Sequence, residues 1–73
     1  MAYQKYVLAI NKDEYDLANE VFTQFYERHD IDSITVEDHY FDGRWIVDVW
    51  VQCSTDDLMA LKAELANRGI SNF

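Results

Sequence analysis

The fold is decided by residues 31–53, which read IDSITVEDHYFDGRWIVDVWVQC. Two runs rich in β-branched and aromatic residues, 31–41 and 44–53, flank the pair Asp42-Gly43. Such a pair between two strand-forming runs is typical of a type I′ hairpin turn, in which both central residues have positive φ. A two-residue turn also sets the register of the strands. One face of the hairpin then carries the residues expected to face the core, which are Ile34, Val36, Tyr40, Trp45, Val47, Val49 and Val51.

The chain before the hairpin predicts one strand and one helix. Residues 3–10 read as a strand with apolar side chains on both faces, a pattern typical of a central or covered strand. Residues 12–29 follow as an amphipathic helix, with Asn11 and Glu14 at the spacing of a capping box. His29 falls in the last turn, where the helix dipole favours a cation.

A second helix is expected after the hairpin, with Ser54 or Thr55 as N-cap and Gly69 as the residue just past its end. The element order is therefore β-α-β-β-α, a single acidic α+β domain over residues 1–73 with two helices on one face of a three-stranded sheet. This order resembles the ferredoxin-like, or split β-α-β, plan with its final strand absent or vestigial. The resemblance implies that one edge of the first strand is free. We expect residues 71–73 or a second copy of the chain, as a homodimer, to cover that edge, or the strand to be a short edge protected by the charge of Lys5.

The chain is strongly acidic for its length. Its 73 residues include 14 Asp and Glu against 6 Lys and Arg, which gives a formal net charge of −8, although 49% of the residues are hydrophobic. A disordered acidic segment contains far less apolar material, so this composition indicates a folded domain. Direct nucleic-acid binding needs clustered Lys and Arg, and is therefore disfavoured. A basic protein surface is the partner that such a charge attracts.

No sequence motif indicates catalysis, a metal or a cofactor. The chain has only two glycines, too few for a Gly-rich phosphate loop, and lacks a cysteine cluster. Cys53 is the single cysteine, so an internal disulfide is excluded. We expect Cys53 to be an inert packed residue in a reducing, cytoplasmic compartment. No run approaches the ~20 apolar residues of a membrane span, and no membrane association is expected.

The other face of the hairpin is the candidate binding surface. Glu37 and Asp48 are predicted to lie directly opposite each other there, although like charges so placed destabilise a hairpin by roughly 0.2–1 kcal/mol. Large apolar residues accompany them on a face expected to be wet, a combination that marks interaction sites. The predicted partner-binding residues are Glu37, Asp38, His39, Phe41, Asp42, Ile46, Asp48 and Trp50. Of these, Asp38 falls on the core face opposite Val47, and we expect it near the rim of the sheet or turned outward by a bulge. A second acidic patch is predicted at Asp13, Glu14, Asp16 and Glu20.

Several functions fit these residues. The first is a non-enzymatic inhibitor or regulator that occupies the basic, nucleic-acid-binding surface of a partner, with carboxylates in place of phosphates. In size, charge and compactness the chain is similar to small acidic bacteriophage proteins that inhibit host nucleases, such as anti-restriction DNA mimics and anti-CRISPR proteins. A ligand-sensing domain of the ACT type is the second, and a small metal-dependent enzyme using Glu37, His39 and Asp48 is the third. A purely structural interpretation, in which Trp50 and Ile46 pack against each other, also stays open.

Overall fold

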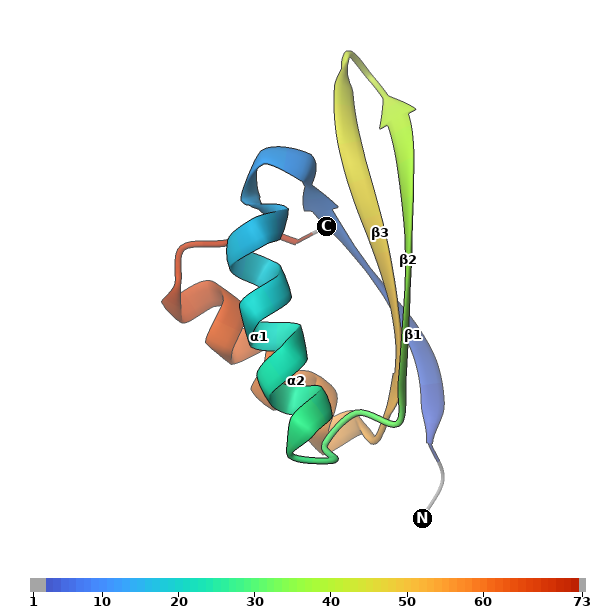
Figure 1. Ribbon diagram of the computed structural model, residues 1–73, viewed down its shortest axis with the longest axis vertical. Helices are drawn as coiled ribbons and strands as arrows, with labels where there is room; N and C mark the ends of the chain where they lie inside the picture. Colours follow the sequence, from blue (N-terminus) through green and yellow to red (C-terminus); the bar gives the residue numbers. More distant parts are fainter. Residues whose placement is uncertain (1–2, 73) are drawn as a thin grey trace.

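The computed structural model describes residues 3–72. Its elements are β1 (Gln4–Asn11), the 3₁₀ turn η1 (Lys12–Glu14), α1 (Tyr15–Glu27), β2 (Ser33–Phe41), β3 (Arg44–Cys53) and α2 (Thr55–Asn67). The strands form one antiparallel sheet in the order β1-β3-β2. Both helices lie on the same side of this sheet (Figure 1). The α+β prediction, with three strands and two helices, is confirmed at this level.

The β2–β3 hairpin has the turn and the register that its sequence predicts. Asp42 and Gly43 have φ angles of 53° and 82°, the positive values of a type I′ turn. Tyr40 pairs with Trp45 across the hairpin, three residues along the ladder from the pair of Glu37 with Asp48. Because side chains alternate along a strand, this register determines which residues face the helices.

The hairpin extends beyond the helices, which cover only its base (Figure 1). On the helix side of β3, the buried residues are Val47, Val49, Val51 and Cys53. On the same side, Val36, Tyr40 and Trp45 are 46%, 61% and 52% exposed. The prediction that this whole face lies in the core is therefore wrong for these three residues. The helices cover neither the tip of the hairpin nor the edge of the sheet that β2 forms.

β1 is an edge strand, and β3 occupies the centre of the sheet. This position agrees with the expected free edge of the first strand, so of the two interpretations of its apolar faces, a central or a covered strand, the central one is wrong. An isolated bridge joins Ile10 to Asn72 at the free edge of β1. The expectation that the last residues cover part of this edge is confirmed at Asn72, whereas Phe73 lies outside the described residues.

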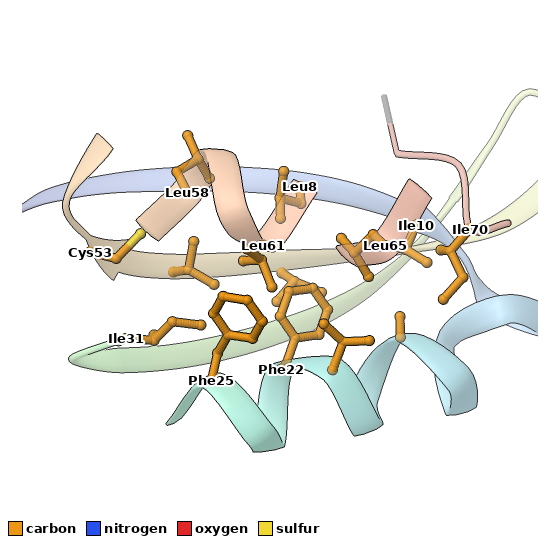
Figure 2. Packing of buried hydrophobic residues seen from close by; sticks show 14 of the residues in the cluster. Leu8, Ile10, Phe22, Phe25, Ile31, Cys53, Leu58, Leu61, Leu65 and Ile70 are labelled. Atoms are coloured by element: carbon orange, nitrogen blue, oxygen red, sulfur yellow. The ribbon is translucent and has the colours of Figure 1, made fainter. Parts of the chain in front are cut away.

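The core fills the space between the sheet and the two helices (Figure 2). Phe22 and Phe25 project from α1 toward the sheet, and Leu61 of α2 lies close to both rings. Leu61 and Leu65 are fully buried. The cluster comprises Leu8, Ile10, Ala18, Val21, Phe22, Phe25, Ile31, Val47, Val49, Val51, Cys53, Leu58, Leu61, Leu65 and Ile70.

The two helices begin differently. Ser54 caps α2, because its Oγ accepts a hydrogen bond of 3.2 Å from the backbone N–H of Asp57. Asn11 makes no such cap bond, and its Nδ2 instead lies 3.4 Å from Oε1 of Glu14. The predicted capping box is therefore absent. The 3₁₀ turn intervenes, so α1 runs from Tyr15 to Glu27 rather than over residues 12–29.

Both helices end in a Schellman motif. In α2, Gly69 has a φ of 75°, and the N–H of Ile70 donates to the carbonyl of Leu65 at 3.0 Å. In α1 the equivalent position is His29, whose φ is 64°. The N–H of Asp30 donates to the carbonyl of Phe25 at 3.0 Å. His29 is thus a backbone turn residue just past the helix end, rather than a residue within the last turn.

Candidate functional site

The side of the sheet opposite the helices is uncovered along its length (Figure 1), and we call it the outer face. Alternation along the paired strands assigns to it Lys5, Val7, Ala9, Asn11, Ser33, Thr35, Glu37, His39, Phe41, Arg44, Ile46, Asp48, Trp50 and Gln52. Six of the eight predicted partner-binding residues belong to this set, and Asp38 and Asp42 do not. The hairpin register therefore brings most of the predicted site together.

Two carboxylates meet in the middle of the outer face. Glu37 of β2 and Asp48 of β3 are directly paired in the ladder, as predicted. Nδ1 of His39 lies 3.0 Å from Oδ2 of Asp48. The imidazole of His39 lies against one of the two carboxylates. The middle of the outer face thus holds a small acidic cluster that attracts a nearby positive charge.

Trp50 adds a large apolar surface next to this cluster. It is 38% exposed and is paired with Val7 of β1 on one side and with Thr35 of β2 on the other. Val7 is 46% exposed. Val7 was not among the predicted site residues, although the apolar residues on both faces of β1 were the signal that could have revealed it.

Ile46 is not an exposed docking residue, contrary to the prediction. It is 4% exposed because β3 is the central strand, where Asn11 of β1 and His39 of β2 flank it. A shallow hollow of about 480 Å³ lies over this region. The residues that line it are Ala9, His39, Phe41, Arg44, Ile46 and Asp48. Ile46 thus forms part of a recess, while Phe41 remains 61% exposed beside it.

Asp38 and Asp42 lie apart from the outer face. Asp38 pairs with Val47 in regular register on the helix side, so no bulge turns it outward. Its Oδ2 lies 2.6 Å from Nζ of Lys12, which also lies 5.5 Å from the ring centroid of Trp45. Asp42 lies in the hairpin turn, where its positive φ is part of the turn geometry.

The second acidic patch lies on the helix side of the molecule. Asp13, Asp16 and Glu20 are exposed, and Glu14 is half-buried. Oε2 of Glu20 lies 3.5 Å from Nη1 of Arg68, so one charge of the patch is already paired. Because η1 and α1 lie across the sheet from the outer face, a single flat partner surface cannot contact both acidic regions.

Among residues 3–72, two pKa values are displaced, both upward and both outside the outer face. Burial raises the pKa of the Tyr15 hydroxyl, and the negative charges of Asp38 and Asp16 add to the effect. Burial also raises the pKa of the Cys53 thiol, with a further contribution from Asp57. Cys53 is fully buried in the core, which confirms that it is a packed residue.

Metal binding and membrane insertion gain no support from residues 3–72. Within this range, no group of three or more His, Cys, Asp or Glu side chains is arranged to hold a metal ion. Glu37, His39 and Asp48 share the outer face without forming such a group. The part of the chain that the structure describes also contains no helix with the length and apolarity to cross a bilayer.

Comparisons of the chain with protein-family models, with curated proteins and with solved structures returned no match.

Proposed function

We propose that this protein is a non-enzymatic protein–protein interaction module whose outer face docks on a basic surface of another protein. One observation carries the proposal. Glu37 and Asp48 are held opposite each other on an uncovered face, next to a Trp50 that is 38% exposed. Like charges so placed cost stability and contribute nothing to the core. A positively charged partner removes this repulsion, and the exposed aromatic ring supplies apolar contact area.

The hollow over Ile46 suggests how a basic side chain binds. Its lining combines apolar carbon from Ile46 and Phe41 with the carboxylate of Asp48. The same lining includes Arg44 and His39, and Nδ1 of His39 lies 3.0 Å from Oδ2 of Asp48. Arginine and lysine carry an apolar stem and a charged head. The stem of such a residue fits against Phe41 and Ile46, with the head at Asp48, where a charge-assisted hydrogen bond forms.

We place the partner among nucleic-acid-binding proteins, and the function in the class of small acidic inhibitors. Such partners carry basic grooves that bind phosphates, and a rigid scaffold with a net charge of −8 complements these grooves. The similarity in size and charge to phage inhibitors of nucleases points the same way. A single buried cysteine suits a cytoplasmic inhibitor of this kind.

We also propose that the fold is a ferredoxin-like plan with a vestigial final strand. The strand order β1-β3-β2 and the Ile10–Asn72 bridge support this assignment. In that plan a fourth strand pairs with β1, at the edge where Asn72 makes its single bridge. This proposal concerns architecture and carries no function, since the plan serves many activities.

The proposed function is tested by capture of partners at low and high salt. The bait is the wild-type chain, and the test bait carries Glu37→Lys with Asp48→Lys. A matched control carries Asp56→Lys with Glu64→Lys on α2, which changes the net charge by the same amount. We expect the wild-type and control baits to retain partner proteins that the test bait does not retain. Duplex DNA and added salt should each release these proteins.

Each outcome bears on a different part of the proposal. Capture that survives the double reversal on the outer face contradicts the proposed site. If both charge variants lose the captured proteins equally, capture depends on net charge alone, which contradicts the proposed site. Partners that duplex DNA does not displace contradict the proposal of a nucleic-acid-binding surface.

A further inference from the structure

The free edge of β1 is open along most of its length. Within residues 3–72, only the Ile10–Asn72 bridge pairs with it, so residues 4–9 present backbone N–H and C=O groups without a strand beside them. A protein normally protects such an edge with charges, proline, a bulge or a covering segment. Residues 4–9 are QKYVLA, with Lys5 as their one charge and no proline. This edge is therefore available to another strand.

The charge distribution favours contact between copies at this strand. Residues 3–12 contain Lys5 and Lys12 and no acidic residue, although the chain as a whole has a net charge of −8. Two molecules with so large a negative charge repel each other over most of their surfaces. They repel least where acidic residues are absent, which is along β1.

We propose that two copies of the chain pair antiparallel through β1, about a two-fold axis at Val7, and join their sheets into one. Asn72 at Ile10 limits the free edge to residues 4–9. An axis perpendicular to the sheet keeps the two outer faces on the same side and pairs residues 5–9 with residues 9–5 of the second copy. Centred on Val7, this pairing stops just before the Ile10–Asn72 bridge.

The side chains of the outer face complement each other in this register. Val7, 46% exposed in one chain, meets Val7 of the second copy, and the row continues to Trp50 on both sides. Lys5 of the second copy pairs with Ala9, whose other neighbour is Asp48. Neighbouring strands lie about 4.8 Å apart, so an extended lysine reaches across one strand toward that carboxylate. The second copy thus covers exposed apolar surface and brings a cation to an acidic site.

The test uses two valines on the two edge strands. Val7 and Val36 are both 46% exposed, and only Val7 lies at the proposed axis. Sedimentation of the wild-type chain should show a species of twice 8.6 kDa. Val7→Lys places like charges directly opposite each other and should raise the dimer dissociation constant by at least about fivefold. Val36→Lys should leave that constant nearly unchanged.

A second pair of variants fixes the register. Val7→Cys should form a disulfide-linked dimer under mild oxidation, because directly opposite Cβ atoms lie about 4.5–5.5 Å apart. Val36→Cys serves as the control, and the native Cys53 is fully buried and does not compete. A monomer at high concentration, a dimer indifferent to Val7→Lys, or equal cross-linking of the two cysteine variants would each overturn the proposal.

This inference does not depend on the proposed partner, and salt separates the two. Salt screens the repulsion between two negatively charged copies, so dimerisation should strengthen as salt is added. Binding to a basic partner should weaken under the same conditions. Failure of one therefore leaves the other standing.

Discussion

Glu37 and Asp48 lie directly opposite each other on neighbouring strands, and both belong to the face of the sheet that no helix covers. Their arrangement works against folding, because like charges in a cross-strand pair lower stability. It serves docking on a basic surface, because the same charges attract cations. Substitutions at this pair should therefore change stability and binding in opposite directions.

Replacing Glu37 with lysine should stabilise the fold and weaken partner binding. The variant converts a like-charged pair into an opposite-charged one, so we expect the free energy of unfolding to rise by about 0.2–1 kcal/mol. Urea denaturation measures this change. Glu37→Gln is the matched control and should give a smaller rise. A loss of stability in both variants would show that the pair is not repulsive.

His29 occupies a position that favours glycine. Its φ of 64° is the left-handed conformation, which Gly69 adopts at the same place after α2. We expect His29→Gly to stabilise the protein by about 0.5–1 kcal/mol, and Gly69→His to destabilise it by a similar amount. Chemical denaturation of the two variants tests this symmetry. An unstable His29→Gly variant would point to a side-chain role for the imidazole.

Aromatic residues at the hairpin tip should contribute far less to stability than those in the core. Phe22 is 1% exposed, and Phe22→Ala should cost about 3–5 kcal/mol. Trp45 is 52% exposed, and its ring lies edge-on to Tyr40 with centroids 5.5 Å apart. Losing that contact in Trp45→Ala should cost about 1 kcal/mol. Comparable losses in the two variants would mean that the tip is packed more closely than described.

Stability should fall as the pH becomes strongly alkaline. Burial raises the pKa of the Cys53 thiol and that of the Tyr15 hydroxyl from their ordinary values, so both groups hold their protons more tightly in the folded chain. The stability that these two groups contribute is fully present while the pH is below their pKa in the unfolded chain. It is lost as the pH rises through their pKa in the folded chain. Urea midpoints measured between about pH 8 and 11 should decline. Cys53→Ala and Tyr15→Phe should each make the decline shallower, whereas Tyr26→Phe should not.

The features predictable from sequence are those set by local chemistry. The Asp42-Gly43 turn has one favoured geometry, and that geometry determined the hairpin register. Gly69 likewise predicted the end of α2, because few other residues accept its φ. Trp50, Glu37 and Asp48 share one face as a direct consequence of the turn.

The features that sequence could not predict depend on the extent of neighbouring elements. Ile46 appeared exposed by alternation, yet the flanking strands bury it. Tyr40 and Trp45 appeared buried by the same rule, yet the helices end before reaching them. Asn11 had the spacing of a capping box, but a 3₁₀ turn displaced the helix start. Periodicity identifies a face, whereas tertiary packing decides how much of that face is covered.

Because the hairpin extends beyond the helices, the molecule offers two contact surfaces of different shape. Near its tip a two-stranded ribbon meets solvent on both sides, with Phe41 on one side and Tyr40 and Trp45 on the other. The bulkier body, where helices back the sheet, lies farther from the turn (Figure 1). A cleft in a partner that is wide enough for a two-stranded ribbon admits the hairpin tip but not the bulkier body. The position at which the helices end therefore sets how deeply the hairpin inserts.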